Sequence, residues 1–303
     1  MSTGTSRLLD FQDTSSINTK INARHADSET VTFLRDKEAD AYGARRRVFS
    51  SMGNINVIVY ADKKELIVDA TNELFKLLLA KPNAVLGFAT GGTFEPVYDC
   101  VTANYANAGV SFGLATGFNL DEYVRLPEVD EQSYHYYMWH RLYSKIDMLK
   151  ENIFIPNGNA RNLDEEIRNY DKLIAACGWI DLQYLGIGVD GHIGFGEQGT
   201  PINSRTFVID LAESTLKANS RYFVGRTMPT RAITMGIGTI LEAKKILMLA
   251  MGPTKRPIID KMKELANADE SVEALTLKIP ALALMRHKNA TVMLDSDAGA
   301  SFL

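Results

Sequence analysis

The sequence predicts an α/β protein with an open, mostly parallel, doubly wound (Rossmann-like) sheet and helices on both faces. From residue 54 onward, short β-rich apolar segments alternate with segments of helical periodicity, a pattern typical of parallel sheets covered by helices. Polar or glycine-rich clusters also follow several predicted strands directly, as ligand-binding loops do in such sheets.

The predicted elements follow in a regular order. "INVIVY" at 55–60 is the first expected strand, and a helix follows up to Pro82, because Asp62 and Glu65 have the spacing of an N-cap and its N3 partner. Further strands are expected at 84–90, 112–118, "IFIP", 182–188, 231–236, 244–250 and 289–295, and helices at 94–107, around 131–145, at 164–177 and from Pro253.

The first 53 residues differ from the rest of the chain. They are polar and show little sustained periodicity, which predicts an N-terminal extension at 1–53, either an arm packed on the protein or partly disordered. Residues 54–303 are expected to form a single α/β domain, since folds of this class often reach 200–300 residues around one core.

The composition limits the possible partners. A net charge of −4 argues against nucleic acid and anionic membranes, which attract clustered Lys and Arg. The N-terminus lacks the apolar region of a secretory signal, and the longest apolar run, at 246–252, is far shorter than a membrane span. The two cysteines, Cys100 and Cys177, form no metal or disulfide motif, so a cytoplasmic protein is expected.

A glycine pair flanked by threonines follows the strand expected at 84–90. Backbone N–H groups at such a turn, together with the start of the next helix, suit a phosphate group, although a tight turn without ligand is an equal alternative. The candidate phosphate-binding residues there are Thr90, Gly91, Gly92 and Thr93. Lys255 and Arg221 are candidate charged partners, each of which alone is more typical of a surface cation.

Two further clusters carry ionisable groups. Asp121 and Glu122 follow the strand at 112–118, where a carboxylate can act as a general base or can simply complement a helix start. Asp190, His192 and Glu197 lie on the glycine-rich loop "GVDGHIGFGEQG". Neighbouring carboxylates can hold a histidine in one tautomer and let it carry protons. A structural histidine remains an alternative, and a metal site is disfavoured because no second His or Cys has ligand spacing.

Together these stretches resemble the glucosamine-6-phosphate deaminase (isomerase) family, which shares its fold with the 6-phosphogluconolactonases. The resemblance is carried by "LGFATGGTFEPVY", "FNLDEYVRL", "LGIGVDGHIGFGE", "SRTFVIDL", "ANSRYF", "AITMGIGTILEAKKILMLAMGPTK" and "HKNATVMLD", in the family's order. It implies that Asp121 is the general base for proton transfer between C1 and C2. It further implies that His192 opens the sugar ring, with Asp190 and Glu197 orienting and polarising it, and that the residues at 90–93, Arg221 and Lys255 bind phosphate.

The implied activity converts glucosamine 6-phosphate to fructose 6-phosphate and ammonia, with no cofactor and no metal. The implied partner is a small-molecule amino sugar phosphate, and the protein is expected to be a monomer or small homo-oligomer. A 6-phosphogluconolactonase-type hydrolase and a non-catalytic sugar-phosphate-binding regulator are the alternatives, and the substrate epimer, glucosamine or galactosamine, stays open.

The chain departs from the family pattern at several places. Gly196 and Gln198 replace an Asn and a Pro, and Arg125 replaces a Gly. In allosteric members an Arg and a Lys after the "SRT" motif help to bind an N-acetylated activator at a subunit interface, and here those places are Phe207 and Ile209. The resemblance therefore implies hyperbolic kinetics without such an activator.

Overall fold

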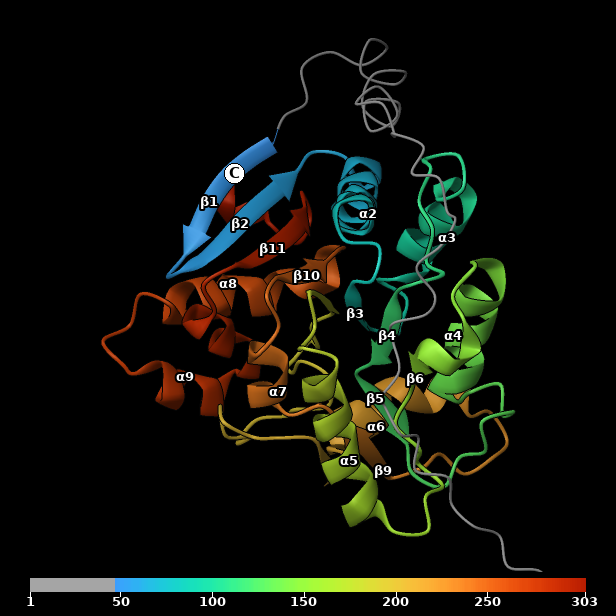
Figure 1. The fold of residues 1–303 in the computed structure, drawn as a ribbon. Coiled ribbons are helices and arrows are strands. Elements are labelled where there is room, and N and C mark those ends of the chain that lie inside the picture. The colour runs from blue at the N-terminus through green and yellow to red at the C-terminus, as the bar shows by residue number, and fades with distance from the viewer. Residues whose placement is uncertain (1–46) are drawn as a thin grey trace, which may run out of the picture.

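The computed structural model describes residues 47–303, in which eight strands form one large sheet and three form a smaller one. The large sheet has the order β1-β2-β11-β10-β7-β3-β4-β6 (Figure 1). Its strands are β1 (Arg47–Met52), β2 (Ile55–Tyr60), β3 (Val85–Phe88), β4 (Thr116–Asn119), β6 (Ile153–Phe154), β7 (Leu182–Leu185), β10 (Ile246–Ala250) and β11 (Ala290–Asp295). Every neighbouring pair is parallel except β1 with β2, so the predicted fold class is confirmed.

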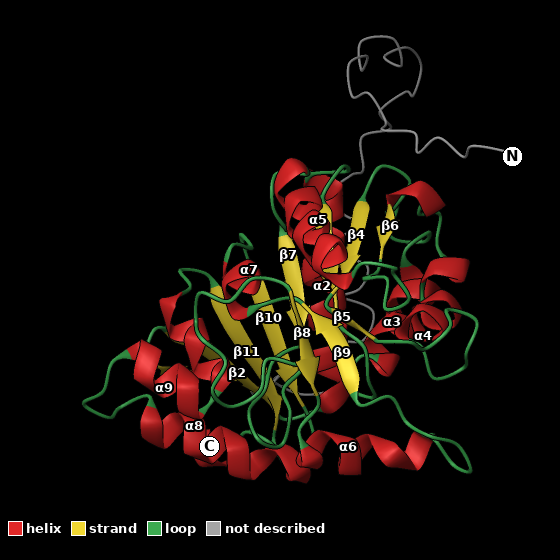
Figure 2. Cartoon of the chain, turned by 90° about the horizontal axis from the view of Figure 1, so that it is seen from below, coloured by secondary structure: helices red, strands yellow, loops and turns green. Residues whose placement is uncertain are grey.

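Helices cover both faces of this sheet. They are α2 (Lys63–Ala80), α3 (Glu95–Asn104), α4 (Tyr134–Arg141), α5 (Leu163–Ala176), α6 (Glu213–Asn219), α7 (Ile237–Leu241), α8 (Arg256–Leu265) and α9 (Val272–Lys278). The predicted N-cap of α2 is confirmed, because the carboxylate of Asp62 accepts the backbone N–H of Lys64 at 2.8 Å. The α2, α3 and α4 helices lie on one side of the sheet, and α5, α7, α8 and α9 on the other (Figures 1 and 2).

The two sets of helices reflect a reversal in strand order. The chain moves outward from β2 through β3 and β4 to β6, and then back through β7 and β10 to β11. Parallel crossovers are right-handed, so the reversal places later helices on the opposite face. It also makes β3 and β7 neighbours whose following connections leave in opposite directions. In doubly wound sheets, the carboxyl ends of such a strand pair form a crevice where ligands bind.

The smaller sheet has the order β5-β9-β8 and is antiparallel throughout. It consists of β5 (Asp121–Tyr123), β8 (Phe207–Asp210) and β9 (Arg231–Thr234). The segment at 231–236 was predicted as a strand of the parallel sheet. It does form a strand, but in this second sheet, which lies beside the carboxyl end of β4 because β5 starts two residues after β4 ends.

Strand β1 lies inside the predicted N-terminal extension at 1–53. Residues 47–52 pair with β2 along its whole length, from Arg47 opposite Tyr60 to Met52 opposite Ile55, so this part of the extension is packed on the main sheet. Arg47 contacts the carboxylate of Asp69 on α2, and Met52 is buried. The other residues of the predicted extension, 1–46, lie outside the described part of the chain.

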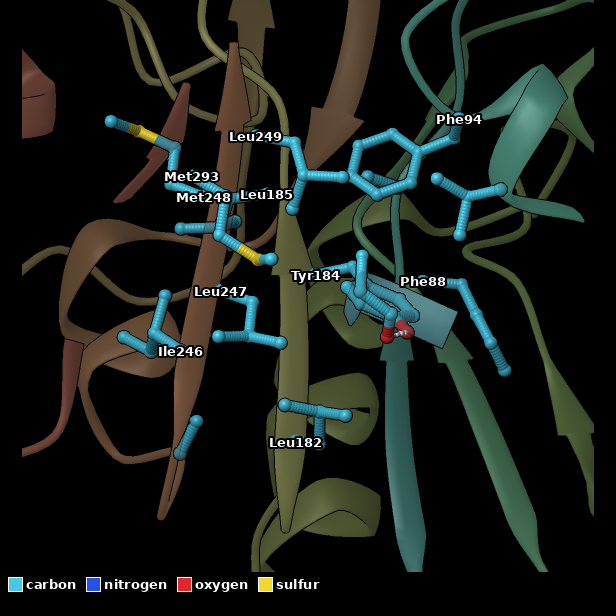
Figure 3. Packing of buried hydrophobic residues seen from close by; sticks show 14 of the residues in the cluster. Phe88, Phe94, Leu182, Tyr184, Leu185, Ile246, Leu247, Met248, Leu249 and Met293 are labelled. Carbon is cyan, nitrogen blue, oxygen red and sulfur yellow. Dashed lines mark hydrogen bonds between the residues drawn. The ribbon is translucent and has the colours of Figure 1, made fainter. Parts of the chain in front are cut away.

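The main core lies between the central strands and the helices. β7 and β10 are buried at every position and β11 at all but one, as expected for strands covered on both faces. Figure 3 shows Leu185, Leu247 and Leu249 of these strands packed with the aromatic side chains beside them. The rings of Phe94 and Tyr184 are 5.5 Å apart, so the start of α3 is held against β7 close to the switch point.

No helix in residues 47–303 is long and apolar enough to cross a membrane.

Candidate active site

The four predicted loops follow four adjacent strands. In the order β10, β7, β3 and β4, these loops carry Lys255, the Asp190–Glu197 cluster, the 90–93 turn and Asp121. Contacts join them: Lys255 Nζ donates to the carbonyl of Ile187 at 2.6 Å, and the N–H of Leu120 donates to the carbonyl of Phe88 at 3.1 Å. The parallel sheet thus gathers chemistry that is scattered along the sequence onto one edge.

The 90–93 turn has the geometry of an open backbone cradle. Gly91 has a φ of 96°, in the left-handed region that favours glycine, and a Cβ at Gly91 or Gly92 would meet only open space. The turn is closed by a hydrogen bond from the N–H of Phe94 to the carbonyl of Gly91 at 2.9 Å, directly before α3. Exposed N–H groups at the start of a helix can donate hydrogen bonds to an anion bound at this turn.

Asp121 lies at the joint between the two sheets. It is the first residue of β5, pairs with Thr234 of β9, and is only 6% exposed. A Cβ built on Gly194 would lie 3.7 Å from Oδ2 of Asp121, so the loop after β7 passes directly beside the carboxylate. Burial, with the neighbouring charge of Glu122, raises the pKa of Asp121 to about 8.

Glu122 faces a different environment from Asp121. Its carboxylate accepts backbone N–H groups from Tyr123 at 2.8 Å, Tyr134 at 3.0 Å and His135 at 2.8 Å. Tyr134 and His135 begin α4, so Glu122 holds the start of this helix. Burial raises the pKa of Glu122 to about 7, against these hydrogen bonds, which lower it. The two carboxylates are neighbours in the sequence, but Asp121 lies beside the loop after β7, whereas Glu122 binds the start of α4.

Asp190 and His192 form a close pair. Nδ1 of His192 lies 2.7 Å from Oδ1 of Asp190, although the ring N–H is not well aligned with that oxygen. The contact with His192 holds the pKa of the Asp190 carboxyl well below its usual range. An ionised Asp190 beside Nδ1 favours the tautomer with its proton on Nδ1, which leaves Nε2 able to accept a proton.

Glu197 was expected to orient His192, but its hydrogen bonds go to α6. Its carboxylate accepts the N–H of Ala212 at 2.9 and 3.0 Å and the hydroxyl of Thr215 at 2.7 Å. Glu197 is buried, and its negative charge complements the start of the helix. Glu197 therefore ties the loop after β7 to the segment that carries α6.

The two predicted cations occupy different settings. Lys255 is partly buried, which lowers the pKa of its ammonium group, while the charge of Asp190 acts in the opposite direction. Its loop is fixed by Asp295 at the end of β11, whose carboxylate accepts the N–H of Gly252 at 2.8 Å. Arg221 lies in the 3-10 helix η3 (Ser220–Tyr222) and is exposed, and its guanidinium donates to the hydroxyl of Tyr222 at 2.8 Å. The structure brings Lys255, but not Arg221, into contact with the loop after β7.

An aromatic cluster beneath α6 was not predicted from the sequence. The ring of Tyr123 lies 5.9 Å from that of Phe195 and 5.8 Å from that of Phe223. Its hydroxyl accepts a hydrogen bond from Nδ2 of Asn219 at 3.1 Å. Thr234 supports the same region, because its hydroxyl accepts the N–H of Phe195 at 2.9 Å. The proximity of Tyr123 to Asp121 in sequence was the only available signal.

The departures from the family pattern have local explanations. Arg125 is exposed with a φ of 64°, a conformation in which the family's glycine is unstrained. A Cβ at Gly196 would lie 3.2 Å from the carbonyl of Ile193, so an Asn at this position needs a small adjustment of the loop. Gln198 is exposed. Within residues 47–303, no group of three His, Cys, Asp or Glu side chains is placed to hold a metal ion.

Fold and site together define a doubly wound α/β protein with a buried carboxylate, an Asp–His pair and an open glycine turn at its switch point. The family model for glucosamine-6-phosphate isomerases and 6-phosphogluconolactonase matches residues 61–293. The chain belongs to this family.

Individual relatives agree with this placement. The chain is 45% identical over 249 residues to a glucosamine-6-phosphate deaminase of Shouchella clausii, covering 82% of this chain and 98% of the relative. It is 44% identical to glucosamine-6-phosphate deaminase 1 of Bacillus subtilis over 73% of this chain and 88% of the relative. A solved structure described as a monomeric glucosamine-6-phosphate deaminase superposes with a TM-score of 0.75 at 41% identity, over 82% of this chain and 99% of the other. A 6-phosphogluconolactonase from Thermotoga maritima, at 18% identity and a TM-score of 0.61, over 79% of this chain and 98% of that one, shares the fold.

Proposed function

We propose that this chain converts glucosamine 6-phosphate to fructose 6-phosphate and ammonia. The observation that carries the proposal is the buried Asp121 at the switch point, beside the loop that bears the Asp190–His192 pair. The relatives that are 44–45% identical are glucosamine-6-phosphate deaminases, which supports the same substrate.

The two proton-transfer steps of the proposed reaction each have a side chain that can carry them out. His192 moves a proton between the anomeric hydroxyl and the ring oxygen, which opens the ring to the aldehyde. Asp121 takes the proton from C2 while the aldehyde oxygen O1 gains a proton from the C2 ammonium group, giving an enolamine; Asp121 then returns its proton to C1, giving a C2 iminium ion. Water adds to C2, the C2–N bond breaks, and ammonia and fructose 6-phosphate leave. No electrons are exchanged with an external acceptor.

The substrate phosphate binds at the 90–93 turn and Lys255. The helix start after Phe94 provides N–H groups, and Lys255 provides a positive charge on the adjacent side of the crevice. Arg221 is a more distant candidate, which reaches the phosphate only through a shift of the α6–η3 segment.

The proposal also includes the cellular location and the oligomeric state of the enzyme. We infer a cytoplasmic enzyme of amino sugar catabolism that acts as a monomer or small homo-oligomer. The monomeric deaminase that superposes on this chain supports this form.

The direct test is a product assay on the purified protein. Glucosamine 6-phosphate should yield equal amounts of fructose 6-phosphate and ammonia, while 6-phosphogluconolactone should not be hydrolysed above its spontaneous rate. Lactone hydrolysis without ammonia would assign a lactonase, and binding of the sugar phosphate without turnover would assign a regulator. Galactosamine 6-phosphate, assayed in parallel, decides the epimer.

Asp121→Asn provides the sharpest variant in this assay. Loss of a positioned general base lowers the rate by about 10²–10⁴-fold or more, whereas binding of the sugar phosphate should persist. Asp269→Asn, an exposed acid beyond α8, is the matched control. Turnover near that of the unchanged protein would remove Asp121 from the mechanism.

Thermal unfolding checks that the Asp121→Asn variant is folded. The pKa of Asp121 is raised in the folded state to about 8, so ionisation of this carboxyl destabilises the fold progressively as pH rises from its unfolded pKa of about 4 toward 8. Asn carries no such charge. The Asp121→Asn protein should therefore unfold at a higher temperature than the unchanged protein, by a margin that grows between pH 5 and pH 8.

A further inference from the structure

A hollow lies away from the candidate active site, between α4 and the edge of the main sheet at β6. Its volume is about 510 Å³, within the range of small-molecule sites in proteins. Tyr136, Trp139 and His140 of α4 form one wall, and Ile153 and Ile155 at the β6 edge form the other. Figure 1 shows α4 beside β6, outward from β4. None of these residues belongs to the candidate active site.

The helix wall is built from flat rings. The rings of Tyr136 and His140 are stacked with centroids 3.8 Å apart, and the carbonyl of Tyr136 lies 2.9 Å from Nδ1 of His140. Trp139 packs partly against the main core while one side lines the hollow. Facing it are branched aliphatic side chains, so the space between the walls accepts a planar apolar group.

The acidic side chain at the hollow has a partner, but one of the basic side chains has none in the described chain. Its one carboxylate, Glu128, is exposed and lies 3.8 Å from Nε2 of His135. Lys150 Nζ lies over the ring of Trp139 at 4.8 Å and, among residues 47–303, forms no ion pair. A ligand in this hollow therefore meets aromatic and aliphatic surfaces with one cation that has no anionic partner in the described chain.

We propose that this hollow is a second binding site, which takes a planar aromatic anion. The ring system lies between Trp139 and Tyr136 on one side and Ile153 and Ile155 on the other. The anionic group contacts Lys150. Stacking and burial provide the affinity, and the charged contact fixes the orientation.

The test uses 8-anilinonaphthalene-1-sulfonate, an aromatic sulfonate with a planar naphthalene ring, whose fluorescence rises in apolar surroundings. We expect saturable binding of one probe per chain. In a Trp179→Phe background, Trp139 is the remaining tryptophan and its emission should be quenched as the probe binds. Trp179 follows α5 on the other face of the sheet, so this background should leave the affinity unchanged.

Substitutions locate the bound probe. Lys150→Met should weaken binding about tenfold, because a charge-assisted contact is worth roughly 1.5 kcal/mol or more. Trp139→Leu should weaken it further. Lys288→Met is the matched control, since this exposed lysine precedes β11, and four strands separate β11 from β6 in the sheet order β11-β10-β7-β3-β4-β6. Thermal unfolding of each variant checks its fold, and Lys150 is exposed, so its loss should not affect folding.

The crevice also attracts anions, so a second pair of measurements separates the two sites. Inorganic phosphate should not displace the probe, and Lys255→Met should bind it with unchanged affinity. Displacement by phosphate, or weakening by Lys255→Met, would place the probe in the crevice and overturn the proposal. Equal affinity of the Lys150→Met and Trp139→Leu proteins for the probe, or no saturable binding, would also overturn it.

Discussion

At the scale of single residues, the proton affinity of Asp121 depends on two features of its position. The first is burial and the second is the charge of Glu122. Glu122 is kept close to Asp121 in a fixed orientation by three backbone N–H groups, two of them from the start of α4. A base with a pKa near the working pH combines an adequate ionised fraction with a strong affinity for the substrate proton.

This arrangement predicts the pH dependence of catalysis. Since Asp121 must be ionised to remove a proton, kcat/KM should rise with pH and reach half of its maximum near the pKa of Asp121, about 8. Glu122→Gln removes a neighbouring negative charge, so the midpoint should move to lower pH. Glu264→Gln, at an exposed position on α8, is the control and should leave the profile in place. A Glu122→Gln profile that superposes on the original would mean that Glu122 serves only to hold α4.

Arg125 is a second residue whose position costs stability. Its φ of 64° places a side chain with a Cβ in the left-handed region, which glycine adopts without strain. Arg125→Gly should raise the free energy of unfolding by about 0.5–1 kcal/mol, net of the greater freedom of glycine in the unfolded chain.

Chemical denaturation measures this change, and turnover of glucosamine 6-phosphate serves as the companion readout. Arg286→Gly is the control. Arg286 is also exposed but has no positive φ, so this substitution should not raise the free energy of unfolding. If Arg125→Gly lowers stability, contacts of the Arg125 side chain outweigh the backbone strain.

At the scale of elements, α6 is attached to the site by a few specific contacts. Glu197 accepts the N–H of Ala212, the residue before α6, and the hydroxyl of Thr215, and Asn219 at the end of α6 donates to Tyr123. Phe223 of the following turn packs on the ring of Tyr123. The segment that carries Arg221 is therefore connected to β5, which begins with Asp121, and to the loop that carries His192.

Tyr123→Phe tests this attachment. The variant keeps the aromatic packing but removes the acceptor of Asn219, so we expect faster amide hydrogen exchange over residues 213–219 and a loss of about 1 kcal/mol in stability. Tyr105→Phe, in a partly buried position near Phe112, is the control. Unchanged exchange in α6 would show that ring packing alone holds the segment.

The strands and helices differ in how well the sequence predicted them. The strands of the parallel sheet from β2 onward and the helices α2, α3, α4, α5 and α8 were predicted from apolar runs and helical periodicity, with errors of up to four residues at their ends. The short elements β8, α6, α7 and α9 were not predicted. β5 has only three residues, two of them acidic, and shows no apolar alternation. β1 has three exposed residues out of six, including Phe49, and shows no apolar alternation. For β9 the strand was predicted correctly, but its partner was not, because pairing in the second sheet depends on segments far apart in the sequence.

The same distinction applies to the candidate site. Asp121, Asp190, His192 and Lys255 follow strands that end at one edge, so the sheet topology alone was enough to predict their proximity. The partners of Glu197 on α6 and the Asn219–Tyr123 contact involve connections with no regular spacing. Only the folded structure brings these residues together.

At the scale of the whole molecule, we expect regulation by N-acetylglucosamine 6-phosphate to be absent. An effector acts only through different affinities for two states. The positions that carry cations in allosteric members of the family are Phe207 and Ile209, which lie on β8, and Ile209 packs against the aromatic cluster around Tyr123. Apolar side chains cannot replace a charged contact to phosphate.

Saturation curves measure this directly. With and without millimolar N-acetylglucosamine 6-phosphate, the rate should depend hyperbolically on glucosamine 6-phosphate, with no change in the half-saturating concentration. A sigmoidal curve that becomes hyperbolic on addition of the effector would contradict the prediction and indicate an effector site built from other residues.

The position of Asp121 between two sheets has a consequence for the cost of ordering the reacting groups. Its backbone is fixed by β4 on one side and by pairing with β9 on the other, and the N–H of Met235 closes the joint by donating to the carbonyl of Leu120 at 2.7 Å. The conformational entropy of this carboxylate is therefore lost when the chain folds and not when substrate arrives. Affinity gained from the sugar and its phosphate can then go to ordering the glycine-containing loops around the substrate, while the base is already in place.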